Sequence, residues 1–126
     1  MPKTVRSIRA PRPRGPYSPA VIAGDLVFVA GQIPVNPDTN ELELGDTRAQ
    51  TRRTLENLRL VLEGAGCSMR DVVRVGVYLA DLGDFAAMNE VYEKFFPANP
   101  PSRTTVGAQL PKIKIEIDCV AHIPSK

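Results

Sequence analysis

Residues 113–121 carry an apolar side chain at every odd position, and charged side chains separate the first four of these positions. The odd positions are isoleucine, isoleucine, isoleucine, cysteine and alanine, and Lys114, Glu116 and Asp118 stand between them. A half-buried strand needs this period of two, because successive side chains point to opposite faces of a sheet. The segment therefore predicts a strand with one face in the core and a charged face outside it.

A second β-type run precedes this strand, from Arg103 to Val106. It is β-branched and follows two prolines, which cannot continue a helix. If the two runs pair as neighbours, Arg103 and Glu116 lie close together and could hold a small acid and position a water molecule against it. Arginine and glutamate on the polar side of a strand are more often simply solvated. The pattern alone leaves both interpretations open.

Residues 26–30 form a continuous apolar run after a turn at Gly24 and Asp25. Continuous rather than alternating hydrophobicity indicates burial on both faces of a strand. Helices can cover one face, and in a chain of 126 residues a partner subunit is the simplest cover for the other. The sequence therefore predicts an oligomer.

Two helices are expected. The first spans 46–65, with a capping box of Thr47 and Gln50 and an apolar stripe at positions 55, 58, 62 and 65. The second follows Asp84 as its cap and stops at Pro97. Its apolar stripe includes Phe85, Met88 and Tyr92, and Asn89 falls inside this stripe, where its amide needs partners and would tie down a neighbouring backbone.

A strand is predicted between the helices at 72–79, with Val73 on the same side as residues 75, 77 and 79. The resulting order β-β-α-β-α-β-β is typical of an α+β fold, with one mixed sheet covered on one face by two helices. A single domain spanning 1–126 is expected, because neither a repeat nor a composition break divides the chain.

The residue inventory excludes several kinds of chemistry. One histidine, His122, and two distant cysteines cannot form a common zinc site, so neither a metal nor a cofactor is expected. No glycine-rich phosphate loop and no Gly-x-Ser-x-Gly elbow is present. The expected reaction is one that water can nearly perform unaided.

Charge and hydropathy limit the partners and the location. A net charge of +2 is too small to make nucleic acid or a membrane surface an obligatory partner. The chain has no apolar run of 18 residues and no secretory signal, and Cys67 and Cys119 are typical of reduced thiols in a cytoplasmic protein. Residues 1–14 carry five basic residues and no acid. They form either a flexible basic arm for nucleic acid or, as is commoner, a frayed or edge-lying terminus.

Three motifs, in order, resemble the signatures of the RidA (YjgF) family of enamine/imine deaminases. They are Gly-Pro-Tyr-Ser at 15–18, Ala-Gly-Gln-Ile-Pro-Val-Asn at 30–36, and Pro-Ser-Arg-Thr-Thr-Val-Gly at 101–107 with the Leu-Pro and Ile-Glu-Ile-Asp that follow. The match runs from about Gly15 to Ala121, nearly the whole chain.

The resemblance implies a chorismate-mutase-like fold that assembles as a homotrimer, with the sheets facing inward and pockets between subunits. It also implies hydrolysis of 2-imino acids, formed from enamino acids such as 2-aminoacrylate, to 2-oxo acids and ammonia. Arg103 would grip the substrate carboxylate with two donors. Glu116, aided by backbone carbonyls near Thr105, would position and partly deprotonate water. The resemblance places Tyr17, Asn89 and main-chain groups around Gly31 in the substrate pocket.

Some positions depart from the family's usual pattern. Ala30 stands where many members have serine, and Thr105 stands where some have cysteine, so the substrate preference could differ. The segment between Arg103 and Glu116 is slightly shorter than usual, and Asp118 lies on the same face as Glu116. Asp118 could therefore replace Glu116 if the pairing register adjusts.

Two other functions use the same residues. In a non-catalytic ligand-binding or regulatory module, Arg103 would capture a small carboxylate or a partner peptide without turnover. RNA binding or cleavage would draw on residues 1–14 and on the translation-inhibitor activities ascribed to relatives. For that function the chain lacks a histidine at an obvious acid–base position and a strong positive field.

Overall fold

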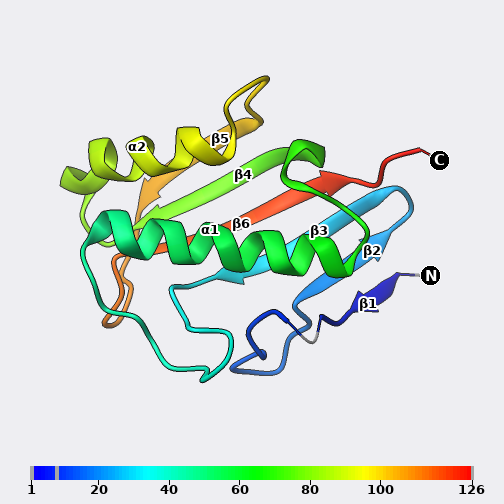
Figure 1. Ribbon diagram of the computed structural model, residues 1–126, viewed down its shortest axis with the longest axis horizontal. Helices are drawn as coiled ribbons and strands as arrows, with labels where there is room; N and C mark the ends of the chain where they lie inside the picture. Colours follow the sequence, from blue (N-terminus) through cyan, green and yellow to red (C-terminus); the bar gives the residue numbers. More distant parts are fainter. Residues whose placement is uncertain (1, 8, 126) are drawn as a thin grey trace.

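The strands of the computed structural model form one mixed sheet. The structure describes residues 2–7 and 9–125, and in this part of the chain six strands lie in the order β1–β2–β3–β6–β4–β5 (Figure 1). Their bounds are Lys3–Val5 for β1, Ala20–Ala23 for β2, Leu26–Gln32 for β3, Val72–Leu79 for β4, Ser102–Gly107 for β5 and Ile115–His122 for β6. Neighbours are antiparallel except β4 and β5, which are parallel.

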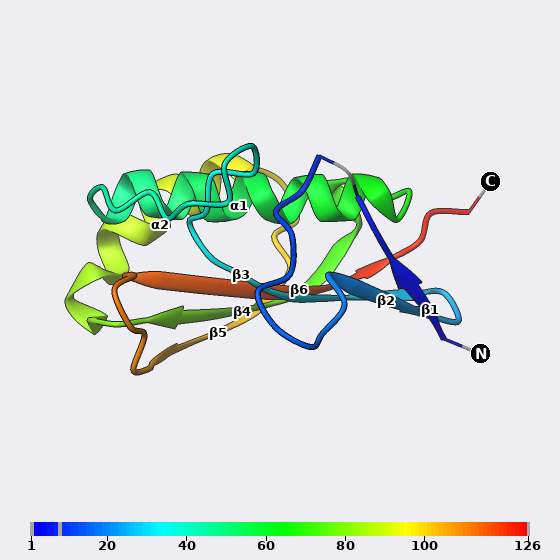
Figure 2. The ribbon, with the colours of Figure 1, turned by 90° about the horizontal axis from the view of Figure 1, so that it is seen from below.

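Two helices, α1 (Thr47–Gly64) and α2 (Phe85–Phe95), cover one face of this sheet, and the other face carries no helix in the described chain (Figure 2). This confirms the predicted α+β architecture. Short 3-10 turns at Met69–Asp71 and Leu82–Asp84 lead into β4 and α2. Neither helix within the described residues is long and apolar enough to cross a membrane.

Strand β6 lies between β3 and β4 and carries the centre of the core. Its apolar positions are buried as the alternation predicted, and Ile115 and Ile117 are completely inaccessible. On α1, Leu55, Leu58 and Leu62 are equally inaccessible. The charged positions of β6 therefore face away from the helices, because the side chains of a strand alternate.

The pairing of the Arg103 strand with the Glu116 strand, which was the condition for their close approach, does not occur. Strand β5 pairs with β4 in parallel, with Arg103 opposite Val75, and β4 separates it from β6. A parallel pair needs a crossover, and α2 supplies it between β4 and β5. The segment from β5 to β6 then passes around the end of β4: the Ala108 N–H donates to the Leu79 carbonyl, and the Ala80 N–H donates to the Lys114 carbonyl.

The start of α1 also differs from the prediction. Asp46, not Thr47, caps the helix, and its side chain accepts the Ala49 N–H at 2.8 Å. Gln50 is buried and joins two other segments: its amide nitrogen donates to the Gly45 carbonyl, and its amide oxygen accepts the Lys114 N–H. The glutamine is thus a connection between α1 and the segment that leads into β6.

A bulge alters the first part of β4. The register with β6 shifts between Val72 and Arg74, so Val72 is buried while Val73 is 47% exposed. Val73 was therefore wrongly assigned to the buried side, since one extra residue reverses the alternation.

The N-terminal segment lies along the sheet edge. Residues 3–5 form β1, which pairs with β2, and Val5 and Ala10 are buried. Arg9 forms an ion pair with Glu63 of α1. Residues 1–14 were predicted to form either a flexible arm or an edge-lying terminus. Residues 1 and 8 lie outside the described residues, and residues 3–5 lie at the edge of the sheet, as the second alternative predicts.

The two helix caps can be compared by mutation. Asp46→Ala should lower the free energy of unfolding by about 1 kcal/mol, because an N-cap acceptor is lost. Asp84 precedes α2 but makes no side-chain capping hydrogen bond, so Asp84→Ala should change it by less than about 0.5 kcal/mol. Equal losses in urea unfolding would contradict this assignment of the caps.

Candidate active site

Arg103 lies on the helix-covered face of β5. Its guanidinium carbon is 4.6 Å from the ring centroid of Tyr92 and 5.5 Å from that of Phe85, both on α2. Its Nη1 donates to Met88 Sδ at 3.9 Å. No ion pair of this side chain is formed within the described residues, so its charge has no carboxylate counter-ion there.

Two further predicted residues lie on this side of the sheet. Thr105 follows Arg103 on the same face of β5, opposite the buried Val77, and its hydroxyl has no hydrogen-bond partner in the described chain. Asn89 is half-buried on α2, one turn after Phe85. Residues four apart on a helix are neighbours, so Asn89 adjoins the aromatic side chain that contacts Arg103. These side chains form the guanidinium half of the candidate site.

Glu116 lies on the opposite, uncovered face. It is half-buried, and its side chain lies directly over the backbone of Gly31 on the neighbouring strand β3. A methyl group on residue 31 would overlap the Glu116 carboxylate. The absence of a side chain at Gly31 therefore lets the carboxylate rest against the main chain, as expected of a glycine at a close approach.

The Asp118 side chain leans toward β4, away from Gly31. It accepts a hydrogen bond of 2.9 Å from the Tyr78 hydroxyl and lies over Gly76, and both of these residues belong to β4. Strands β3 and β4 flank β6 on opposite sides, so Glu116 and Asp118 lean apart. Glu116 is therefore the carboxylate next to Gly31, which argues against its replacement by Asp118.

The pKa of Glu116 is raised above its ordinary value, first by burial and second by the negative charge of Asp118. The hydrogen bond to Asp118 raises the pKa of Tyr78. A carboxylate with a raised pKa is a stronger proton acceptor than an exposed one, which suits a general base.

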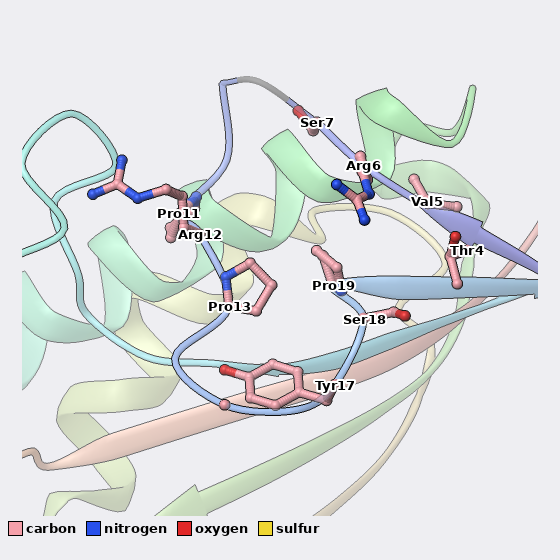
Figure 3. Close-up of a pocket in the computed structure, with 11 residues that line it drawn as sticks. Thr4, Val5, Arg6, Ser7, Pro11, Arg12, Pro13, Tyr17, Ser18 and Pro19 are labelled. Atoms are coloured by element: carbon pink, nitrogen blue, oxygen red, sulfur yellow. The ribbon is translucent and has the colours of Figure 1, made fainter.

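Tyr17 stands on the loop before β2 and is 48% exposed. The Arg14 N–H donates to its hydroxyl, and the Ala30 N–H donates to the Pro19 carbonyl, which fastens the end of this loop to β3. Tyr17 and Gly31 line one narrow crevice. A larger cavity of about 440 Å³ lies between this loop and the N-terminal segment (Figure 3). Tyr17 therefore belongs with Gly31 and Glu116 in the carboxylate half of the site.

The predicted site residues thus form two separate groups. Arg103 and Thr105 lie under α2, whereas Glu116 and Gly31 lie on the uncovered face, with β4 between the strands β5 and β6. One chain alone does not bring the arginine and the glutamate together.

Three contacts of Arg103 were not singled out as functional from the sequence. Phe85, Met88 and Tyr92 were interpreted only as the apolar stripe of a helix. Their spacing of three and four residues gives such a stripe whether they cover a sheet or hold an arginine. The parallel pairing of β4 and β5, which sets Arg103 beneath them, was the missing information.

Among the described residues, no group of three or more histidine, cysteine, aspartate and glutamate side chains is arranged to hold a metal ion. The polar groups of the two halves are instead a cation, a carboxylate and neutral hydroxyl and amide groups. Such groups can bind a small acid and orient a water molecule.

Comparison with known proteins identifies the family. The family model described as Endoribonuclease L-PSP matches residues 7–123, and the chain belongs to this YjgF/RidA family. It is 50% identical over 116 residues to a RutC family protein of Pyrococcus abyssi, covering 90% of this chain and 91% of the relative. It is 43% identical over 126 residues to the 2-iminobutanoate/2-iminopropanoate deaminase of Escherichia coli, covering 96% and 98%.

Solved structures agree with this assignment. A putative endoribonuclease of Thermotoga maritima matches with a TM-score of 0.94 and 41% identity, covering 99% of this chain and 100% of that one. TdcF of E. coli, crystallised with bound serine, matches with a TM-score of 0.89 and 41% identity, covering 95% and 98%.

The coupling of the two carboxylates can be measured. Asp118→Asn should lower the pKa of Glu116 but leave it above its ordinary value, because burial, the larger cause, remains. A ¹³C NMR titration of the Glu116 carboxylate would give both values. An unchanged pKa in the variant would show that the charge of Asp118 does not reach Glu116.

The raised pKa of Glu116 also determines how the stability of the protein changes with pH. The folded chain holds the Glu116 proton to a higher pH than the unfolded chain, so the free energy of unfolding should fall as pH rises from about 4.5 through the raised pKa. Glu116→Gln should remove this component, as measured by urea unfolding at a series of pH values.

Proposed function

We propose that the protein hydrolyses 2-imino acids of the 2-aminoacrylate and 2-iminopropionate type to 2-oxo acids and ammonia. The observation that carries this proposal is the guanidinium of Arg103, which is held against aromatic rings and has no carboxylate partner in the described chain. A half-buried cation of this kind is available to a substrate carboxylate. The name of the E. coli deaminase and the serine bound to TdcF support the same class of small carboxylate ligand.

The two halves of the site come together between subunits of a homotrimer in this proposal. Arg103 and Glu116 are on opposite faces of one sheet, so a second chain must supply the missing half. The uncovered face also carries apolar side chains that suit an interface: Phe28 is 45% exposed and Val106 is 41% exposed. Apolar surface of this kind on the open face of a sheet favours contact with another subunit.

Arg103 of one subunit binds the substrate carboxylate through two parallel hydrogen bonds. This places the adjacent C=N carbon within reach of a water molecule that Glu116 of the neighbouring subunit orients. The backbone carbonyls near Thr105 assist in holding the water, and Tyr17 and Asn89 shape the pocket around the substrate.

Hydrolysis then proceeds with a balanced movement of protons. The substrate reacts as its protonated iminium: Glu116 takes one proton from the water as its oxygen bonds to the imine carbon, and the C=N bond becomes the single C–N bond of a neutral amine. Glu116 returns this proton to the nitrogen and then accepts the hydroxyl proton, so the C=O bond forms as the C–N bond breaks and ammonia leaves a 2-oxo acid. Imines hydrolyse readily in water, so orientation and charge placement supply the modest acceleration required.

A carboxylate-binding module without turnover uses the same Arg103. It differs from the enzyme in one result only: it would bind 2-oxo acids and leave the rate of imine decay unchanged. A function on RNA has less support, because two of the basic N-terminal side chains have intrachain partners. Arg9 pairs with Glu63, and Arg14 donates to the Asn40 carbonyl.

The main test is complementation between two inactive variants. Arg103→Ala should lower kcat/KM about a hundredfold or more through loss of a charge-assisted contact. Glu116→Gln should lower kcat about a hundredfold through loss of a general base. The imine is generated by a coupled amino-acid oxidase, and its decay is followed directly.

Mixed trimers of these two variants should regain activity. Refolding an equal mixture leaves about a quarter of the interfaces with an intact Arg103 and an intact Glu116, from different chains. About a quarter of the wild-type rate is therefore expected, whereas each variant refolded alone stays inactive. Failure of the mixture to recover, with trimers formed, would show that both residues act within one chain or that the assignment is wrong.

The assembly itself can be tested at the uncovered face. Wild type should elute as three chains of 13.7 kDa, or about 41 kDa, in size exclusion with light scattering. Phe28→Glu should yield smaller species, because a charge is placed in the apolar interface. Leu44→Glu, at a side chain that is 56% exposed outside the sheet, serves as the control and should remain trimeric.

A further inference from the structure

Arg103 is fixed by side chains that do not neutralise its charge. The guanidinium lies over the rings of Tyr92 and Phe85 and donates to the sulfur of Met88. These three residues stand three and four positions apart, so they form one row on the face of α2 above β5. Arginine stacks favourably on aromatic faces, most strongly where water is excluded.

The other well-anchored arginines are held differently. Arg48 pairs with Glu90 at 2.6 Å, and Arg59 pairs with Glu56 at 2.6 Å. A carboxylate in such a position would compete with a bound carboxylate ligand for the same N–H groups. Aromatic rings hold the cation without occupying its in-plane donors, and a thioether is only a weak acceptor.

We propose that Tyr92 is the positioning residue of Arg103, with Phe85 as a second, weaker support. The ring of Tyr92 fixes the plane of the guanidinium so that its paired N–H donors face the substrate carboxylate. This inference rests on the proposed function for the identity of that carboxylate, but the geometry of the contact does not depend on it.

The setting of Tyr92 supports a role for its ring rather than its hydroxyl. The residue is 6% exposed, and its ring packs on that of Phe96 with centroids 4.7 Å apart, so its own orientation is fixed. The hydroxyl has no hydrogen-bond partner within the described residues. The guanidinium carbon of Arg103 lies 4.6 Å from the centroid of this ring, and the charge of Arg103 also acts on the hydroxyl, where it opposes the rise in pKa caused by burial.

Three variants separate this role from simple core packing. Tyr92→Phe keeps the ring, Tyr92→Leu removes it, and Val91→Ala is the control, because Val91 is a buried residue of the same helix. Each is measured for imine hydrolysis, for 2-oxobutanoate affinity by calorimetry and for thermal stability.

Tyr92→Leu should raise KM and the 2-oxobutanoate Kd about tenfold, the effect expected from loss of a partly desolvated cation–π contact. The value of kcat should stay within about threefold, because holding the carboxylate contributes equally to the ground and transition states. Tyr92→Phe should bind as wild type, and Val91→Ala should lose stability with KM unchanged.

Two results would overturn the inference. If Tyr92→Leu and Val91→Ala both lose stability while KM and Kd stay at their wild-type values, Tyr92 is only a core residue. If Tyr92→Phe weakens binding as much as Tyr92→Leu, the hydroxyl and not the ring is responsible.

Two further measurements apply if Tyr92→Leu does not fold or if the wild type does not accelerate imine decay. If Tyr92→Leu does not fold, Phe85→Leu replaces it at a position that is 40% exposed, and its Kd should rise about threefold. If the wild type does not accelerate imine decay, the proposed function fails, and Kd alone then tests the role of Tyr92. A wild type that does not bind 2-oxobutanoate would overturn both.

Discussion

The burial of one face of β6 against α1 fixes the remainder of this structure. Ile115 and Ile117 are completely inaccessible opposite the leucines of α1. Burial of such side chains is worth about 1.5–3 kcal/mol each, so the strand cannot turn over without losing the core. The charged positions of β6 are consequently held on the uncovered face. Glu116 and Asp118 owe their place in the molecule to the apolar residues between them.

The neighbours of β6 then give these two carboxylates different surroundings. Glu116 rests on Gly31 of β3, while Asp118 accepts a hydrogen bond from Tyr78 of β4. Two acids of one strand thus differ in what they contact, although they share a face. Asp118 has a hydroxyl partner. Glu116 has a raised pKa and lies beside Gly31, the glycine that the family resemblance placed in the pocket.

The arginine occupies the opposite side of the same sheet because α2 crosses from β4 to β5. That crossover makes β5 an edge strand, parallel to β4, and sets Arg103 beneath the aromatic residues of α2. The guanidinium is held there without a carboxylate in the described chain. In the proposed mechanism, the cation on one face and the carboxylate on the other form a single site where two copies of the chain meet.

The sequence by itself determined the two helices, the strands from β3 onward and the α+β arrangement, because the periods of two and 3.6 are local properties of the chain. It did not locate β1 and β2. It also determined which residues are functional candidates, through the three motifs. Only the tertiary structure decided which strands are neighbours. The assumption that β5 and β6 pair was wrong, since alternation records which face a side chain takes but not which strand lies beside it. The caps and the bulge at Val73 were missed for a related reason, because single hydrogen bonds and one extra residue leave no periodic signal. The separation of Arg103 from Glu116 is likewise a consequence of topology, and no local pattern in the chain encodes it.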